Sequence, residues 1–460
     1  MADWLSHALT YIPRWIDFQR ELTEQPGVVV AIASGNRVVL EHASGVADLS
    51  TGAPLTPRHR LRVASHSKTF TAAGIMKLRE QGKISLDDPA GKFIKGLHAD
   101  VARATIGQLL SHSAGVTRDG PNAGQFHDRR DYLSREQMLA DLAQPQPLPA
   151  ATTFKYSNHG MALLGMIIEA ISGEAYSAWA KREIIDAAGL KETEPEFAAE
   201  LVQPFARGHS MKHPFGRRLV IPGDGLGRAI SSAGGYVSTA GDLARFFAML
   251  SPTAPQSFLS DVSRREMTRG QWRDRHSTFE RYYGLGTISG APGPWWWVGH
   301  SGSWQGYITR TATIPDQGLT ISVVTNAVDG PAQAWVDGVI HILRTLKEAG
   351  APSDATADWT GRFWTLWGPL DFVPTAGRVL IATPALAMPF TDATEIELSG
   401  PDAGRVAKAQ AFGDLAEPVR RERDASGAVR VIWLGGKELK STEDFAKEFE
   451  AKYGASKAPS

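Results

Sequence analysis

A serine and a lysine three residues apart form the first pattern in this sequence that could do chemistry: residues 65–68 read Ser-His-Ser-Lys. The apolar stretch that follows predicts a helix, and residues three apart lie on one face of a helix. Ser65 would then lie where the helix N–H groups stabilise negative charge. A buried lysine loses its charge more easily, so Lys68 could accept a proton from the hydroxyl. Alone, this pattern is more typical of a helix cap beside a solvated lysine.

Two further patterns place polar groups beside apolar segments. Residues 156–158 read Tyr-Ser-Asn at the entrance to an apolar helix, where a buried tyrosine and an asparagine cap would also explain them. Residues 299–303 read Gly-His-Ser-Gly-Ser after a run of tryptophans. Small residues on an edge strand let backbone N–H groups approach a substrate, although a tight strand with a surface histidine explains the same letters. Each pattern is ambiguous by itself.

In this order and spacing, the three patterns resemble the serine β-lactamase and penicillin-binding protein superfamily. That superfamily has Ser-x-x-Lys, then Tyr-x-Asn, then a Lys-Thr-Gly or His-x-Gly strand. Segments 105–115, 231–239 and 306–307 also look like those of family members, and the resemblance covers about residues 8–346. The tyrosine of the second pattern makes the chain similar to class C β-lactamases, DD-peptidases and family VIII esterases. In this resemblance, the His-x-Gly strand is associated with D-alanyl carboxypeptidases, D-aminopeptidases and esterases.

The resemblance implies a role for each residue of the three patterns. It implies Ser65 as the nucleophile of an acyl-enzyme, with Lys68 and Tyr156 sharing the proton relay. Tyr156 would be the base toward Ser65, and Asn158 would hydrogen-bond Lys68 or a substrate amide. The implied oxyanion hole consists of the backbone N–H groups of Ser65 and Ser303. The resemblance also implies that His112 is structural.

The sequence departs from most β-lactamases at His300, where they have lysine. A histidine is only partly charged near neutral pH, so it would hold a substrate carboxylate less firmly than an ammonium group does. Trp304 and the tryptophans at 295–297 could line an aromatic pocket or belong to the core. The expected substrate-binding and oxyanion residues are Asn158, His300, Gly302, Ser303 and Trp304.

The elements that must position these residues follow from hydrophobic patterns. Two β-branched runs, 28–33 and 37–40, flank a Ser-Gly-Asn turn and predict a β-hairpin. The apolar segments 69–78 and 158–171 predict buried helices. Further strands are expected at 295–298, 307–314 and 319–325, and helices at the N-terminus up to about Thr23 and at 331–346. The predicted class is α+β: an antiparallel sheet flanked by helices, with a helical subdomain.

The composition changes after Gly350. Residues 351–358 are typical of a linker, and from 359 onward short alternating segments are separated by Gly, Pro and Asp. We therefore expect a hydrolase domain over 1–350, with its helical subdomain at about 66–250, then a small lipocalin-like β-barrel or sandwich over 359–460. That domain could bind a partner, form oligomers or narrow the active-site mouth.

Composition excludes several other functions. The 460 residues include 49 basic and 49 acidic side chains, and zero net charge argues against binding nucleic acid or a membrane surface. The absence of cysteine excludes disulfides, thiolate metal sites and a cysteine nucleophile. The histidines lack metal-ligand spacing, so we expect no metal and no cofactor. The N-terminus reads as an amphipathic helix rather than a signal peptide, which favours a cytoplasmic protein.

Together these observations predict a serine hydrolase that acts through Ser65 on small esters or peptide-like amides, as a carboxylesterase, D-aminopeptidase or peptidase. A weak β-lactamase or DD-carboxypeptidase is the second interpretation. A non-catalytic ligand-binding or sensor relative is the third, although such a relative would usually have lost the lysine or the tyrosine. The sequence leaves the physiological substrate and the oligomeric state open.

Overall fold

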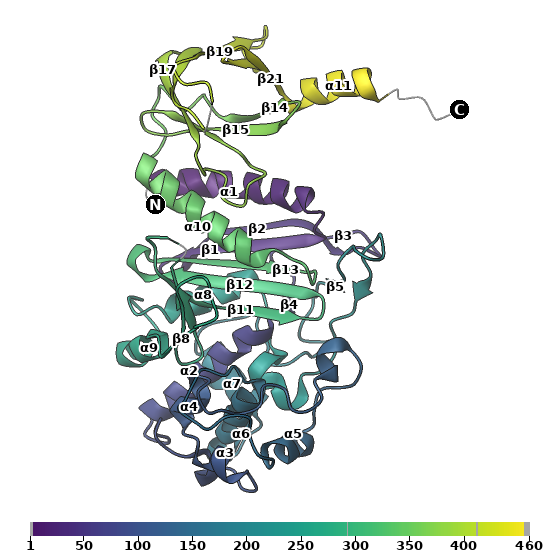
Figure 1. Ribbon diagram of the computed structural model, residues 1–460, viewed down its shortest axis with the longest axis vertical. Helices are drawn as coiled ribbons and strands as arrows, with labels where there is room; N and C mark the ends of the chain where they lie inside the picture. Colours follow the sequence, from purple (N-terminus) through teal and green to yellow (C-terminus); the bar gives the residue numbers. More distant parts are fainter. Residues whose placement is uncertain (1–2, 292, 411–412, 455–460) are drawn as a thin grey trace, which may run out of the picture. The chain divides into compact units, whose positions relative to one another are not determined.

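The computed structural model describes residues 3–291, 293–410 and 413–454 (Figure 1). The chain divides into two compact units. One consists of residues 24–336, and the other combines residues 1–23 with 337–460.

Among its described residues, the unit 24–336 is built on a nine-stranded antiparallel sheet in the order β3-β2-β1-β13-β12-β11-β10-β9-β8. Its neighbouring strands β1 (Gly27–Ser34) and β13 (Leu319–Thr325) come from opposite ends of the unit, and Val28 pairs with Thr325. The other strands are β2 (Arg37–Asp48), β3 (Ala53–Pro54), β8 (Trp272–Arg273), β9 (Arg281–Tyr283), β10 (Ile288–Gly290), β11 (Trp297–Trp304) and β12 (Tyr307–Ile314). The first and last segments of the unit thus share one sheet, as the sequence predicts.

Most of the helices lie between β3 and β8 in the chain. They are α2 (Ser67–Glu80), α3 (Ala99–Arg103), α4 (Ile106–Leu110), α5 (Arg135–Leu142), α6 (Asn158–Ser172), α7 (Tyr176–Ala180), α8 (Ala240–Met249) and α9 (Asp261–Thr268). Short two-stranded ladders join β4 (Leu61–Arg62) to β7 (Val237–Ser238) and β5 (Gly208–His209) to β6 (Val220–Ile221). The expected buried helices are α2 and α6. The Ser157 hydroxyl caps the start of α6, and Gly173 ends it in the left-handed conformation.

Strand β11 differs from the expected edge strand. It begins at Trp297 and contains the whole Gly-His-Ser-Gly-Ser pattern, and it lies between β12 and β10. However, β10 pairs only with residues 297–299. From His300 onward, β11 therefore has no paired strand on this side, and its backbone can approach another part of the chain or a ligand there.

The second unit contains α1 (Asp3–Leu22), most of α10 (Ala332–Ala349), a β-barrel and α11 (Thr442–Tyr453). The barrel strands are β14 (Gly361–Thr365), β15 (Gly368–Pro374), β16 (Val379–Ala382), β17 (Thr394–Gly400), β18 (Ala403–Lys408), β19 (Pro418–Arg423), β20 (Val429–Leu434) and β21 (Lys437–Ser441). Each strand pairs antiparallel with the next, and β21 closes the barrel on β14. Of the two expected forms, the structure is the barrel. Among the described residues, no helix is long and apolar enough to cross a membrane.

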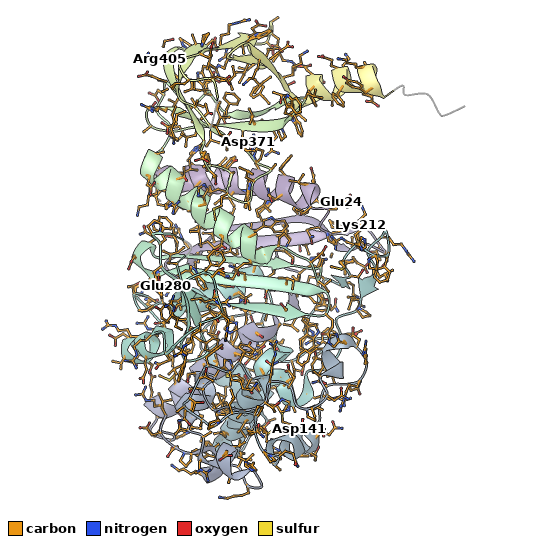
Figure 2. All side chains as sticks on the ribbon, in the orientation of Figure 1. Glu24, Asp141, Lys212, Glu280, Asp371 and Arg405 are labelled. Carbon is orange, nitrogen blue, oxygen red and sulfur yellow. The ribbon has the colours of Figure 1, made fainter. Side chains whose placement is uncertain are left out.

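Helix α1 groups with the barrel, whereas the sequence assigns it to the hydrolase domain. The Tyr11 hydroxyl donates to the buried carboxylate of Asp371, which Figure 2 labels, over 3.1 Å. Gln19 Nε2 donates to the carbonyl of Pro384 over 2.6 Å. The expected linker is also part of this unit, because Thr356 is buried and its hydroxyl donates to the carbonyl of Thr375.

Candidate active site

Ser65 is presented by a short turn between β4 and α2. This 3₁₀ turn, η1 (Ala64–His66), follows β4 after one residue, Val63, and leads into α2. Ala64 has a φ of +48°, a left-handed conformation that is uncommon for residues with a side chain and is often found at functional sites. Within residues 61–76, all of which the structure describes, Ser65 is the one residue that is not buried. The local backbone therefore exposes the serine while burying its neighbours.

Lys68 and Tyr156 both reach the Ser65 hydroxyl. Lys68 Nζ lies 3.0 Å from Ser65 Oγ and donates a second hydrogen bond, of 2.7 Å, to the carbonyl of Ala233. The Tyr156 hydroxyl donates to Ser65 Oγ over 3.0 Å, although the two residues are 91 positions apart. The segment just before α6 thus brings the tyrosine to the serine, and the first turn of α2 brings the lysine.

Burial shifts the pKa values of these two groups in opposite directions. It lowers the pKa of Lys68 to about 7, and the Asp119 carboxylate offsets part of this shift. It raises the pKa of Tyr156 above its usual value, although the hydrogen bond to Ser65 works against the rise. At neutral pH the phenol keeps its proton, whereas the amine is close to losing one. These pKa shifts favour Lys68, rather than the expected Tyr156, as the group that accepts the Ser65 proton.

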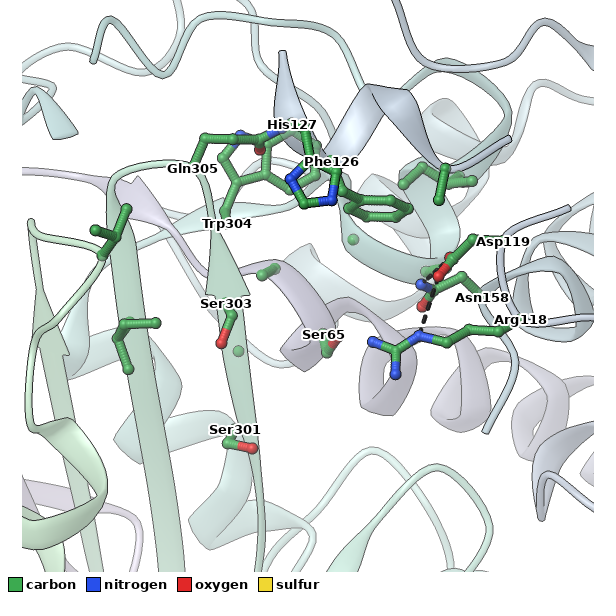
Figure 3. A pocket seen from close by; sticks show the side chains of 18 of the residues that line it. Ser65, Arg118, Asp119, Phe126, His127, Asn158, Ser301, Ser303, Trp304 and Gln305 are labelled. Atoms are coloured by element: carbon green, nitrogen blue, oxygen red, sulfur yellow. Dashed lines mark hydrogen bonds and ion pairs between the residues drawn. The ribbon is translucent and has the colours of Figure 1, made fainter. Parts of the chain in front are cut away.

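The serine opens into a cavity of about 870 Å³. Seven of the eight expected site residues line it, and Lys68 lies buried behind Ser65. Those seven are Ser65, Tyr156, Asn158, His300, Gly302, Ser303 and Trp304. Figure 3 shows β11 with Ser303 on one side of Ser65 and Arg118 with Asn158 on the other. The three sequence patterns therefore meet at one cavity.

The open edge of β11 approaches the serine turn closely at Gly302. A Cβ atom there would lie 2.2 Å from the backbone oxygen of Val63, so only glycine fits. Ser303, the next residue, is exposed to the cavity. The close contact holds the backbone of Ser303 beside Ser65, as an oxyanion hole requires.

The sequence leaves open whether the tryptophans line the cavity or belong to the core, and the structure contains one of each kind. Trp304 lines the cavity and stacks on the ring of Tyr132, with ring centroids 4.7 Å apart. Trp297 is buried, and the guanidinium of Arg310 lies 4.0 Å from its ring. Trp304 is therefore a wall of the cavity, and Trp297 is a core residue.

His300 belongs to a buried chain of hydrogen bonds. His112 Nδ1 accepts the backbone N–H of Ser157 over 3.2 Å, so a neutral His112 carries its proton on Nε2. That nitrogen lies 3.1 Å from the Tyr283 hydroxyl, which lies 3.2 Å from His300 Nε2. His300 Nδ1 lies 2.7 Å from the carbonyl of Ser301 and 3.0 Å from the backbone N of Ser301, and the Tyr283 hydroxyl therefore links the two imidazole rings.

This arrangement corrects the expectation that His300 holds a substrate carboxylate by its partial charge. Burial, together with the neighbouring His66 and Lys68, lowers the pKa of His300 well below its usual value. Both ring nitrogens are also already hydrogen-bonded. His300 is a neutral support for β11, and it offers no positive charge to the cavity.

Asn158 does not hydrogen-bond Lys68, the first of its two expected partners. Its Nδ2 donates instead to Asp119 Oδ1 over 2.6 Å, and Asp119 Oδ2 accepts from Arg118 Nε over 3.0 Å. Arg118 and Asp119 line the cavity, and neither they nor Tyr283 belong to the three sequence patterns. Arg118 and Asp119 have a signal in the sequence: they are an adjacent pair of opposite charges that lies two residues beyond the buried stretch 109–116.

Comparisons with known proteins identify the family and the fold. The family model described as Beta-lactamase matches residues 15–341. A penicillin-binding protein of Bacillus subtilis is 28% identical over 339 residues, which cover 69% of this chain and 72% of the relative. The octameric penicillin-binding protein homologue from Pyrococcus abyssi superposes with a TM-score of 0.65 at 23% identity, over 94% of this chain and 99% of that one.

A D-stereospecific amidohydrolase from Streptomyces sp. superposes with a TM-score of 0.57 at 25% identity, over 70% of this chain and 94% of that one. The expected superfamily and the expected fold are confirmed. The family model spans more than half of the sequence, and the chain belongs to the Beta-lactamase family.

Proposed function

We propose that this protein is a serine hydrolase that forms an acyl-enzyme on Ser65 with small esters or short peptide-like amides. The observation that carries the proposal is the position of Ser65 Oγ, 3.0 Å from both Lys68 Nζ and the Tyr156 hydroxyl at the wall of a cavity. The cavity volume is in the usual range for small-molecule sites. The likeness to an amidohydrolase supports amides as substrates beside esters.

Acylation would begin with neutral Lys68. With its proton lost, Nζ can accept the Ser65 proton while Tyr156 donates its own hydrogen bond to the same oxygen. Ser65 Oγ attacks the substrate carbonyl carbon, and the backbone N–H groups of Ser65 and Ser303 stabilise the resulting oxyanion. The ester or amide bond then breaks, and Tyr156 gives its proton to the leaving group. The proton held by Lys68 restores Tyr156, and water hydrolyses the acyl-enzyme to acid and free Ser65.

Two other activities have less support from the site. A non-catalytic sensor has no need for a lysine and a tyrosine that both contact the serine. For β-lactam or DD-carboxypeptidase turnover, β11 itself supplies no cation for the substrate carboxylate, because its histidine is neutral and buried.

Intact-protein mass spectrometry tests the proposal. The protein is exposed briefly to a fluorophosphonate, to p-nitrophenyl acetate and to a penicillin. We expect a stoichiometric fluorophosphonate adduct and rapid turnover of the acetate, both lost in Ser65→Ala. Ser301→Ala, which removes another hydroxyl from the same cavity, should keep the adduct. An adduct that survives Ser65→Ala would overturn the proposed nucleophile, and a long-lived penicillin adduct would favour the penicillin-recognising alternative.

A further inference from the structure

Arg118 is a cation at the mouth of the cavity whose terminal nitrogens have no partner among the described residues. Its side chain is 64% exposed, and its Nε is bound to Asp119. No hydrogen bond or ion pair within the described part of the chain uses its two Nη groups. Figure 3 shows the guanidinium extending from the Asn158 side toward Ser65. Both Nη groups are therefore open to a ligand in the cavity.

The backbone that carries Arg118 is fixed to the start of α6. Its carbonyl accepts the N–H groups of Asn158 and His159, over 2.9 and 3.2 Å. The carbonyl of Thr117 accepts the Ser157 hydroxyl over 2.6 Å. The guanidinium lies 5.4 Å from the ring of Tyr156. The backbone of Arg118 is thus fixed beside the tyrosine that contacts the nucleophile, so this part of the chain needs no ordering when a ligand binds.

Asp119 orients the guanidinium rather than offering a free anion. One of its oxygens accepts from Asn158 and the other from Arg118 Nε. Because Nε is occupied, the two parallel N–H groups at the far end of the guanidinium form the available fork. That fork matches the two oxygens of a carboxylate.

Other cationic candidates in the cavity differ from Arg118. His300 is neutral and buried. Arg129 also lines the cavity, but it is exposed and has no ion pair or side-chain hydrogen bond within the described residues that would fix it. Of the two described arginines that line the cavity, Arg118 is therefore the one whose guanidinium is fixed by an ion pair, and it lies across Ser65 from β11.

From this placement we propose that Arg118 binds a carboxylate of the substrate, so that the site selects esters or peptides that carry a free carboxylate over neutral or cationic ones. The inference rests on the proposed hydrolase function and specifies its substrate class. The carboxylate could belong to the acyl group or to the leaving group, and the experiment distinguishes the two.

The test compares matched substrates. For the acyl side, p-nitrophenyl hydrogen glutarate is compared with p-nitrophenyl pentanoate. For the leaving-group side, meta-acetoxybenzoate is compared with meta-acetoxybenzamide. In one of the two pairs, the wild type should have the higher kcat/KM for the carboxylate. Arg118→Gln should lower that preference by about tenfold, the scale of one lost charge-assisted contact. Arg118→Lys should retain part of it, because the point charge remains without the fork.

Three results would overturn the inference. Arg118→Gln could slow the charged and neutral substrates equally, which would show that Arg118 acts through Tyr156. The preference could be lost in Arg129→Gln instead of Arg118→Gln. The wild type could prefer a D-amino acid amide with a free ammonium group. Arg265→Gln, an exposed arginine of α9 outside the cavity, controls for the loss of one surface charge.

A binding measurement separates this inference from the proposed function. Calorimetry on Ser65→Ala measures the affinity for glutarate without any turnover, and Arg118→Gln in that background should weaken it by about tenfold. If Arg118→Gln loses glutarate binding but the wild type turns over no neutral ester, the carboxylate-binding role of Arg118 would be supported and the proposed hydrolase function would be contradicted. If ester turnover depends on Ser65 but Arg118→Gln leaves glutarate binding unchanged, the hydrolase function would be supported and the role of Arg118 would be contradicted.

Discussion

A single physical cause, burial, prepares two residues for opposite tasks. Burial disfavours whichever form of a group is charged, so it lowers the pKa of the Lys68 amine and raises that of the Tyr156 phenol. Both groups are then closer to neutral, one able to take a proton and the other able to give one. Ser65 Oγ lies between them and can donate to Lys68 while it accepts from Tyr156.

The pKa of Lys68 predicts the pH dependence of the reaction. Only neutral Lys68 can accept the Ser65 proton, so kcat/KM for a neutral ester should rise with pH through about 7 and then level off. Lys68→Arg stays protonated throughout and should lose about a hundredfold to ten-thousandfold in rate, the usual contribution of a general base. Rates measured from about pH 5 to about pH 9 test this. A rate that is flat or falls through pH 7 would contradict the role of Lys68.

Sequence patterns predict those site residues that lie a short, fixed number of positions apart in the chain. Ser65 and Lys68 lie on one turn of helix, so their contact follows from the sequence. Tyr283 could not be found in this way, because it meets His112 across 171 positions. The same holds for Asp119, whose bond to Asn158 spans 39 positions and depends on how a loop folds back onto α6.

At the scale of elements, the site depends on the spacing between β11 and the η1 turn. Gly302 allows that spacing, because any Cβ would overlap the backbone oxygen of Val63 and would also lie 2.7 Å from Thr309 Oγ1. Backbone atoms cannot move aside as a flexible side chain can. A side chain at this position must therefore push the strand away from Ser65.

Gly302→Ala should reduce activity much more than stability. We expect kcat/KM to fall by about a hundredfold, as a displacement of about 1 Å can cause, and the free energy of unfolding to fall by about 1–3 kcal/mol. Ester kinetics and urea unfolding measure the two effects. Gly377→Ala is the control, since its Cβ would meet nothing within 4 Å and both properties should stay at wild-type values. Wild-type activity in Gly302→Ala would show that β11 need not lie so close.

Tyr283 connects two histidines on different elements, and its hydroxyl has no substitute there. Tyr283→Phe leaves Nε2 of His112 and Nε2 of His300 buried without their shared partner. The free energy of unfolding should fall by about 1–3 kcal/mol for each group, which urea unfolding measures. Tyr282→Phe is the matched control, because its hydroxyl bonds Glu280 at the surface. Equal effects of the two substitutions would contradict the buried chain.

At the scale of the whole molecule, local sequence patterns predict individual helices and strands better than they predict which compact unit each of them joins. Strands β12 and β13 begin and end where the hydrophobic pattern of the sequence places them, because each strand is specified by its own residues. The assignment of α1 to the barrel unit could not be predicted. Its bonds to Asp371 and Pro384 span 360 and 365 positions, and an amphipathic helix does not show which partner covers it.

The division into two units predicts that core damage in one unit loosens that unit first. Trp15 of α1 is fully buried, and its Nε1 donates to the carbonyl of Leu386. Trp179 is buried in the other unit, against Gly74. Replacing either tryptophan with alanine should cost about 3–5 kcal/mol. Hydrogen exchange followed by mass spectrometry should then show protection lost first in 337–454 for Trp15→Ala and first in 24–336 for Trp179→Ala. If Trp15→Ala instead exposed the sheet around Ser65 first, α1 would belong energetically to the hydrolase unit, as its place in the sequence suggests.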